Sequence, residues 1–278
     1  MIDKKLSLKQ VEPHRWVFKY LEGKKMMALD DKLYKAIDLM NEGSLKEAEE
    51  LYISLIIQHP NYIDAYHHLA MLLNIKGKNK EAFNMWEKAV DIGMRCFPKN
   101  FKIGDDIIEW GFIENRPFFR AYHGLGLAYL GKHDVEKALS IFNDILVLNP
   151  DDNQGIRSLV VECNFALKKP DEVLKVCQKY SDDTMGEILY GYPLAFFQLG
   201  KKDKAEKKMK EAIGYLPLIA KELIKTRHSK PKSIYGSYLE MGGADEAYVY
   251  WERSGIFWKN TEGALEFVRE SVKKYDNK

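Results

Sequence analysis

Residues 65–89 read AYHHLAMLLNIKGKNKEAFNMWEKA, and the fold class follows from this stretch. Bulky and small side chains recur every three or four positions on both sides of Gly77, which predicts two helices joined by a short turn. Tyr66 and Trp86 are bulky, whereas Ala70 and Ala82 are small. Side chains at a helix crossing set the distance between the two backbones, so small residues at these positions predict a closely packed helix pair.

The same pattern returns along the chain at regular distances. Ala48 and Ala82 lie 34 residues apart, and Pro150 and Pro217 lie 67 apart. The pattern resembles the tetratricopeptide repeat (TPR), a helix pair with a period of about 34 residues. The resemblance implies an all-α fold, an α-α superhelix or solenoid of about five to six helix pairs. The further copies are Gly43, Ala48, Tyr52 and Pro60; Ala121, Tyr122, Leu125, Gly126, Ala138, Phe142 and Pro150; and Gly200, Ala205, Met209, Ala212 and Pro217.

The repeats predict one continuous solenoid domain with five parts. The lead-in is expected to cover the first repeat, because the end of a solenoid exposes apolar surface. The insertion is rich in aromatic and branched residues, so we expect at least one short helix in it. The parts are an N-terminal lead-in or cap at 1–28, repeats 1 and 2 at 29–94, the insertion at 95–118, repeats 3 to 5 at 119–217, and a degenerate repeat with a C-terminal capping helix at 218–278.

Two local signals refine the C-terminal half. Pro193 lies inside the first helix of repeat 5, and a proline there predicts a kink or a local break. Thr261 is followed by Glu262, a pair that predicts the start of a capping helix at 262–275 with Thr261 as its N-cap.

Composition narrows the class of protein. Hydrophobic residues make up 46% of the chain, charged residues 30%, and the formal net charge is only +2, so the overall charge favours no class of partner. Cys96, Cys163 and Cys177 form no CxxC pair, and an odd number of cysteines suits a reducing compartment. The N-terminus lacks the apolar core of a signal peptide, and no apolar run approaches the ~20 residues of a membrane span. We therefore expect a cytoplasmic protein that does not enter a membrane.

The concave side of the solenoid is the predicted binding site. The first helix of each pair lines that side, and its groove-facing positions are polar and mildly basic in repeats 2 to 4. Arginine, histidine and asparagine side chains in such a groove would hold an acidic peptide or a C-terminal carboxylate through charge-assisted hydrogen bonds. The predicted protein- or peptide-binding residues are His67, Met71, Asn74, Arg116, Arg120, His123, Gln154, Arg157, Asn164 and Tyr190.

The alternative interpretation of the two central arginines is structural. Arg120 and Arg157 would then pair with Asp64, Asp152 or Glu187 and serve only the fold. The sequence does not distinguish this pairing from ligand binding.

Other kinds of site have weaker support. Gly124 and Gly126, with Gly131, imitate a phosphate-binding loop, but no predicted strand precedes them. His67 and His123 with Asp64 would give a sparse metal site, whereas zinc normally takes three or four ligands. No G-x-S-x-G or HExxH motif is present. We expect no enzymatic activity, no cofactor and no bound metal.

A basic stretch at 201–232 gives a second candidate function, the binding of RNA or another polyanion. No aromatic residues alternate with its lysines as base stacking would require, which favours a solvated helix face instead. We therefore do not expect nucleic acid as the partner, and the oligomeric state stays open. Its basic residues are Lys201, Lys202, Lys204, Lys207, Lys208, Lys210, Lys221, Lys225, Arg227, Lys230 and Lys232.

Four longer segments resemble the suppression-of-tumorigenicity family of TPR proteins and its bacterial relatives. They are ENRPFFRA at 114–121, NPDDNQGIR at 149–157, DEAYVY at 245–250 and WKNTEGAL at 258–265. The resemblance implies a non-enzymatic helical-repeat protein, and it draws attention to Arg116, Arg120, Asn153, Gln154 and Arg157. This chain has neither the membrane span of the eukaryotic members nor the Cys/His tail of many bacterial ones, so membrane and zinc functions are not carried over.

Overall fold

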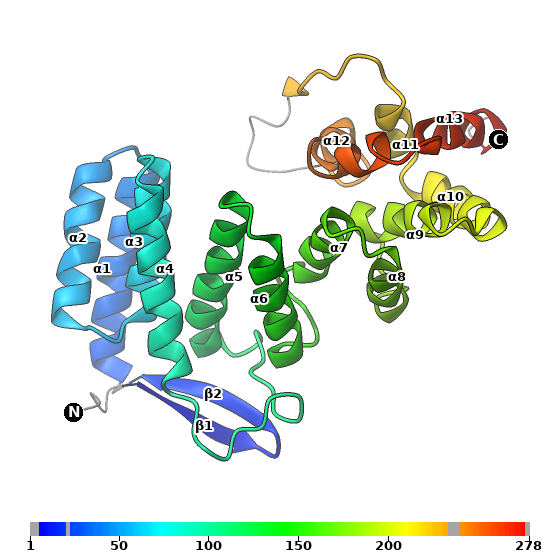
Figure 1. Ribbon diagram of the computed structural model, residues 1–278. Helices are drawn as coiled ribbons and strands as arrows, with labels where there is room; N and C mark the ends of the chain where they lie inside the picture. The colour runs from blue at the N-terminus through cyan, green and yellow to red at the C-terminus, as the bar shows by residue number, and fades with distance from the viewer. Residues whose placement is uncertain (1–5, 21–22, 233–239, 276–278) are drawn as a thin grey trace. The chain divides into compact units, whose positions relative to one another are not determined.

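The computed structural model describes residues 6–20, 23–232 and 240–275 of the chain (Figure 1). In these ranges helices in consecutive pairs dominate, as the all-α prediction requires. They group into two compact units, Met1–Ile156 and Arg157–Lys278. None of the helices in the described part of the chain combines the length and apolar character that a membrane crossing requires.

The first unit holds three helix pairs. Their crossing points carry the small residues expected from the repeat pattern, because Ala48, Ala82 and Ala138 are fully buried. A side chain at Gly126 would come within 2.4 Å of the Phe142 ring, so the crossing of the third pair requires glycine. The pairs are α1 (Gly23–Asn41) with α2 (Leu45–Gln58), α3 (Ile63–Ile75) with α4 (Asn79–Met94), and α5 (Arg116–Gly131) with α6 (Val135–Leu148).

The N-terminal segment forms an antiparallel hairpin of strands β1 (Leu6–Glu12) and β2 (Arg15–Tyr20). The ring of Phe18 lies 6.4 Å from Phe97 and 5.2 Å from Phe118, so the hairpin packs on the insertion and the start of α5. Asn115 fixes this contact: its side-chain amide accepts from Phe18 N at 2.9 Å and donates to Trp16 O at 3.2 Å.

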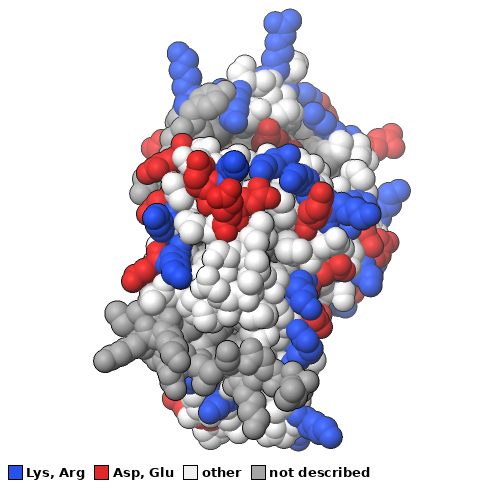
Figure 2. Space-filling model, turned by 90° about the vertical axis from the view of Figure 1, so that its left-hand side faces the viewer, with Lys and Arg blue, Asp and Glu red and all other residues white. Residues whose placement is uncertain are grey.

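The end of the hairpin also reaches the first repeat, where the ring of Tyr20 lies 6.4 Å from that of Tyr62. Tyr34 of α1 and Ile53 and Ile57 of α2 stay 63%, 42% and 73% exposed. Figure 2 looks onto the side of the molecule where α1 and α2 lie, and it shows uncharged surface bordered by charged residues.

The insertion is ordered by hydrogen bonds to distant residues. Between α4 and α5 its described residues form one short helix, η1 (Ile113–Asn115), a single 3-10 turn, as its composition predicts. The carboxylate of Asp106 accepts from Lys102 N at 2.7 Å and closes a tight loop. Ile108 N donates to Leu148 O at 2.7 Å, which joins the insertion to the end of α6.

The second unit continues the helix pairs and surrounds its own apolar core, in which Trp258 is fully buried. Helix α9 runs unbroken through Pro193, so the predicted local break is absent there. The capping helix begins later than expected, because the Thr261 hydroxyl donates to Phe257 O at 2.8 Å and closes the preceding helix instead. The helices are α7 (Ile156–Ala166), α8 (Pro170–Lys179), α9 (Gly186–Gln198), α10 (Lys202–Tyr215), α11 (Pro217–Leu223), α12 (Ala244–Lys259) and α13 (Ala264–Tyr275).

Candidate functional site

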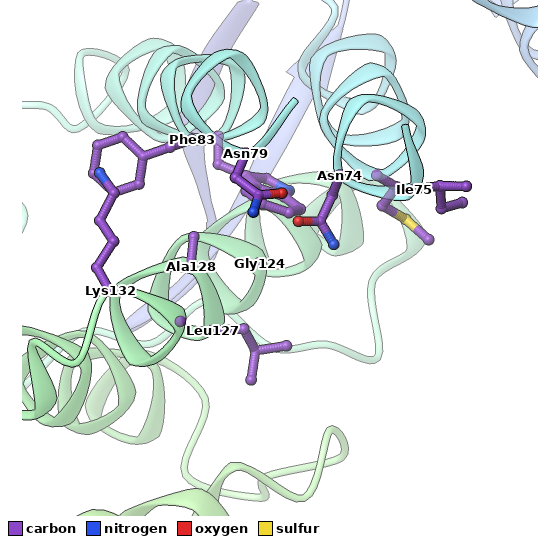
Figure 3. Close-up of a pocket in the computed structure, with 11 residues that line it drawn as sticks. Asn74, Ile75, Asn79, Phe83, Gly124, Leu127, Ala128 and Lys132 are labelled. Carbon is purple, nitrogen blue, oxygen red and sulfur yellow. The ribbon is translucent and has the colours of Figure 1, made fainter. Parts of the chain in front are cut away.

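A groove of about 430 Å³ lies between α3, α4 and α5 of the first unit (Figure 3). Two residues of the sequence-based prediction, Met71 and Asn74, line it. The remaining lining residues come from the end of α3, the first half of α4 and α5 with the turn that follows it. The full lining is Met71, Asn74, Ile75, Asn79, Phe83, Trp86, Gly124, Leu127, Ala128, Gly131 and Lys132.

The floor of the groove is a fixed, uncharged contact. Trp86 Nε1 donates to His67 Nδ1 at 3.3 Å, and both side chains are buried. Burial, and then the nearby charges of His68, Arg120 and His123, lower the pKa of His67 well below its usual value, so its ring is neutral and Nδ1 accepts. A Cβ at Gly124 would lie 2.4 Å from Trp86 Nε1, so only glycine lets the indole lie against α5.

The walls combine apolar and amide side chains. Met71, Ile75 and Leu127 are 37%, 61% and 43% exposed, which is high for side chains of this kind. Asn74 and Asn79 come from α3 and α4, and Figure 3 shows their amides turned toward one another. Each amide offers two N–H donors and one carbonyl acceptor, the combination that a peptide backbone can match.

One cation stands at the edge of the groove. Lys132 Nζ lies 2.9 Å from the centre of the Phe83 ring, a cation–π contact between the end of α5 and α4. Lys132 is itself exposed. Its charge is therefore available to a ligand that enters the groove from solvent.

Arg120 is engaged within the fold. Its guanidinium forms two parallel hydrogen bonds with the carboxylate of Asp64, Nε to Oδ1 at 3.1 Å and Nη2 to Oδ2, which join α5 to α3. Asp64 is buried, so the pair holds two first helices together and its charges cancel. Asp64 is one of the partners that the sequence predicts for Arg120 if this arginine serves only the fold.

The other predicted residues of the first unit make separate contacts. Arg116 donates to Trp110 O at 3.1 Å and lies 5.4 Å over the indole ring of that residue. The ring of His123 lies 6.1 Å from that of Phe142. Gln154 is half-buried, and its Oε1 has no hydrogen-bond partner in the described chain.

Three predicted residues belong to the second unit. Arg157 pairs with Asp183, which is not one of the partners expected for it, and lies 5.4 Å over the Tyr180 ring. Asn164 is buried and donates to Val160 O at 2.9 Å. Tyr190 is fully buried, and its hydroxyl donates to Leu216 O at 2.7 Å. The polarity of Asn164 and Tyr190 is thus used inside their own unit, away from solvent.

Sequence reasoning missed Ile75, Asn79, Phe83 and Lys132. It considered positions along first helices only, whereas these residues flank the turn at Gly77 or lie beyond Gly131. The signal that could have found some of them is the position of exposed apolar, amide and basic residues, here Ile75, Asn79 and Lys132, at the same end of neighbouring helix pairs. Within the described ranges, no three His, Cys, Asp or Glu side chains come together as a metal site requires.

Solved structures show that these helix pairs have the TPR fold. A TPR protein from Parabacteroides merdae ATCC 43184 is 17% identical, with a TM-score of 0.50 over 90% of this chain and 100% of that chain. The MamA protein is 15% identical, with a TM-score of 0.51 over 73% and 98%. YrrB, described as a TPR protein with an unusual peptide-binding site, is 20% identical, with a TM-score of 0.50 over 67% and 85%. The TPR resemblance of the sequence is confirmed.

The family model Tcf25, described as transcriptional repressor TCF25, matches residues 18–278. The match begins in β2 and includes nearly all of both units. The segments that resemble the suppression-of-tumorigenicity family lie within the matched residues. A search of the curated proteins found no match.

Proposed function

Because this chain belongs to the TCF25 family and has the TPR fold, we propose that it is a non-enzymatic scaffold that holds an extended segment of another protein in the groove of its first unit. The observation that carries the proposal is the groove itself. Two asparagine amides and three exposed apolar side chains surround a preformed, uncharged floor.

The lining chemistry suits a peptide. Asn74 and Asn79 would bond the backbone of the segment, and Met71, Ile75 and Leu127 would receive one or two of its apolar side chains. A floor already fixed by the bond between Trp86 and His67 would need little ordering when a ligand binds, which favours affinity.

The charge of the groove suggests which segments fit. Lys132 is the one charged residue in the lining, and Arg120 is neutralised by Asp64. An acidic residue next to an apolar one in the segment would therefore pair with Lys132. The sequence predicts that Arg120 and Arg157 bind an acidic peptide. In this proposal Lys132 binds the acidic residue instead.

Two of the comparisons are compatible with this role. YrrB, which shares the fold, is described as having a peptide-binding site. The family description names a transcriptional repressor, and a scaffold that holds a segment of a second protein could serve in such a complex.

The test is selection of binding peptides from a seven-residue display library on the purified protein. The selected peptides, made synthetically, should bind the double variant Asn74→Ala, Asn79→Ala about thirtyfold more weakly, since two neutral hydrogen bonds contribute about 1 kcal/mol each. Selection on Lys132→Glu should lose the acidic residue. Fluorescence anisotropy measures the affinities.

Asn84→Ala is the matched control, because Asn84 is an exposed asparagine on α4 outside the groove. Peptides should bind this variant with unchanged affinity. The proposal is wrong if no sequence is enriched, or if the selected peptides bind the double variant and the wild type equally well.

A further inference from the structure

The outer face of α10 in the second unit carries lysines that the proposed groove does not use. Lys201, Lys202, Lys204, Lys207 and Lys210 are all exposed, and none of them forms an ion pair with a described residue. The nearby carboxylates are engaged elsewhere on this surface, because Glu211 pairs with Lys208 and Glu206 with Lys274. Asp203 is the remaining acidic residue of the helix.

The position of the first lysines opposes the helix dipole. The N-terminus of a helix carries partial positive charge, where acidic residues stabilise and lysines destabilise. Lys201 precedes α10 and Lys202 opens it, so the two add to the positive potential of the helix start. These lysines give no stability to the helix at that end, and the potential they create attracts anions.

The fold also brings aromatic rings from α9 and α13 to this lysine face. Lys204 lies 5.8 Å from the Phe196 ring and Lys208 lies 4.7 Å from the Tyr192 ring, both on α9. Lys210 lies 5.8 Å from the ring of Tyr275, at the end of α13. Tyr192 is buried and these rings lie under lysines, so stacking on a base requires a further ring that is exposed.

Tyr215, the last residue of α10, is a further ring on this face, and it is accessible. It is 64% exposed and lines a hollow of about 480 Å³ together with Lys207, Lys210, Glu211 and Gly214. A Cβ at Gly214 would have no heavy atom within 4 Å, so the space beside the ring is open. A flat ligand can lie against the tyrosine there, next to two ammonium groups.

A second hollow on the other side of Tyr215, about 440 Å³, has a different character. Its charged lining residues are Asp182, Asp183, Lys208 and Glu211, of which Asp183 pairs with Arg157 and Glu211 with Lys208. Acidic residues outnumber the one lysine there, so the side of Lys207 and Lys210 is the one that suits a phosphodiester backbone.

We propose that this lysine–tyrosine face of α10 binds single-stranded nucleic acid, with Lys207 and Lys210 contacting phosphates and Tyr215 stacking on a base. Single strands present the flat faces of their bases, and base stacking on an aromatic residue together with lysine–phosphate contacts is how proteins hold them without reading sequence.

An anionic membrane fits this surface less well. Interfacial helices insert an apolar face, but Ala205, Met209, Ala212 and Ile213 of α10 are all buried in the unit. Duplex DNA also fits less well, because its bases are stacked on one another and cannot cover Tyr215.

The test measures binding of fluorescein-labelled oligo(U) of 15 nucleotides to the full chain by anisotropy, at 50 and 200 mM NaCl. We expect Tyr215→Ala to weaken binding about tenfold or more. Lys207→Gln with Lys210→Gln should weaken binding and lower the salt slope by about 1.4, since each lost phosphate contact removes about 0.7 for a single strand.

The controls are matched by exposure and by position. Tyr34→Ala removes a tyrosine that is 63% exposed on α1, and Lys80→Gln with Lys137→Gln removes exposed lysines from the first turns of α4 and α6. Both variants should bind oligo(U) as the wild type does. An abasic oligomer of equal length should bind wild type and Tyr215→Ala alike, because it has no base to stack.

Three results would overturn the proposal. They are no binding of oligo(U) at 50 mM NaCl, equal affinity of the α10 variants and the control variants, and tighter binding to phosphatidylserine vesicles than to oligo(U). Asn74 and Asn79 lie in the first unit, whereas Tyr215 lies in the second. A negative result with oligo(U) therefore does not count against peptide binding in the groove, and a negative peptide selection does not count against nucleic-acid binding by α10.

Discussion

Trp86 and Gly124 make the contact on which the floor of the groove depends. The indole fits because residue 124 has no side chain, and its N–H is satisfied by the neutral ring of His67. Glycine is a poor helix former, so its presence in the middle of α5 has a packing reason.

Gly124→Ala should therefore destabilise the protein, although alanine normally favours a helix. The new Cβ would lie 2.4 Å from Trp86 Nε1, and displacing a packed side chain costs about 1–3 kcal/mol. Urea unfolding followed by circular dichroism measures the loss. Gly131→Ala is the control on the same helix, because a Cβ there meets nothing within 4 Å, and its stability should be equal or higher. Equal effects of the two substitutions would contradict the packing account.

Stability should also fall in mild acid because of His67. Burial lowers the pKa of its ring in the folded chain below the 6.5 of an unfolded one, so the unfolded chain binds a proton more readily. The stability that the protein gains from keeping His67 neutral is therefore fully present above pH 6.5. It decreases as the pH falls from 6.5 toward the pKa of His67 in the folded chain. His67→Asn keeps an acceptor for Trp86 but does not titrate. Comparing urea unfolding at pH 7.5 and 5.5, the wild type should lose more stability than this variant, and equal losses would exclude His67 as a source.

At the scale of elements, the helix pairs depend on small residues at their crossings and the hairpin depends on one asparagine. Ala82 and Ala138 leave no room for a larger group, since both are fully buried. Asn115 is also fully buried, and its amide bonds β2 and the insertion at once.

Ala82→Asp should abolish the cooperative unfolding of the first unit, because an unpaired carboxylate at a crossing costs several kcal/mol. Ala138→Asp should act in the same way on the next pair. Asn84→Asp puts the same charge on the exposed side of α4 and should leave the urea midpoint nearly unchanged. A normal cooperative transition in Ala82→Asp would refute the packing register of the pair.

Asn115→Ala should release the hairpin from the insertion. It removes hydrogen bonds to Phe18 N, Trp16 O and Glu109 O and leaves buried backbone groups unsatisfied, at a cost of about 1–3 kcal/mol for each group. Hydrogen exchange should accelerate in residues 15–20 and not in α6. Asn153→Ala, at an exposed position, is the control. Unchanged exchange in 15–20 would show that the hairpin is held by its aromatic contacts alone.

At the scale of the whole molecule, the chain forms two units with separate apolar cores. The core of the second unit is drawn from residues between Val161 and Val268. Its largest fully buried side chain is Trp258, whose Nε1 donates to the Tyr250 hydroxyl at 2.9 Å.

Trp258→Ala should therefore destabilise the second unit and leave the first unit as stable as before. Loss of a buried tryptophan costs about 3–5 kcal/mol, and in repeat proteins destabilisation stays close to the altered repeat. Hydrogen exchange should rise across α9 to α13 and stay unchanged in α2 to α4. Trp251→Ala, at a half-buried position on the same helix, should have a smaller effect. A uniform rise over both units would contradict their independence.

The sequence by itself determined the helix pairs and the TPR architecture, because they depend on residues three, four and about 34 positions apart. Ala70 and Ala82, or Gly126 and Ala138, reveal a crossing through their size and spacing alone. Only the tertiary structure decided which distant residues meet: Asp64 with Arg120, Phe18 with Asn115, and Asn74 with Leu127 and Lys132 around one groove. Periodic spacing encodes the face of a helix that is buried, but a contact between distant residues depends on how whole pairs stack, which no local pattern records.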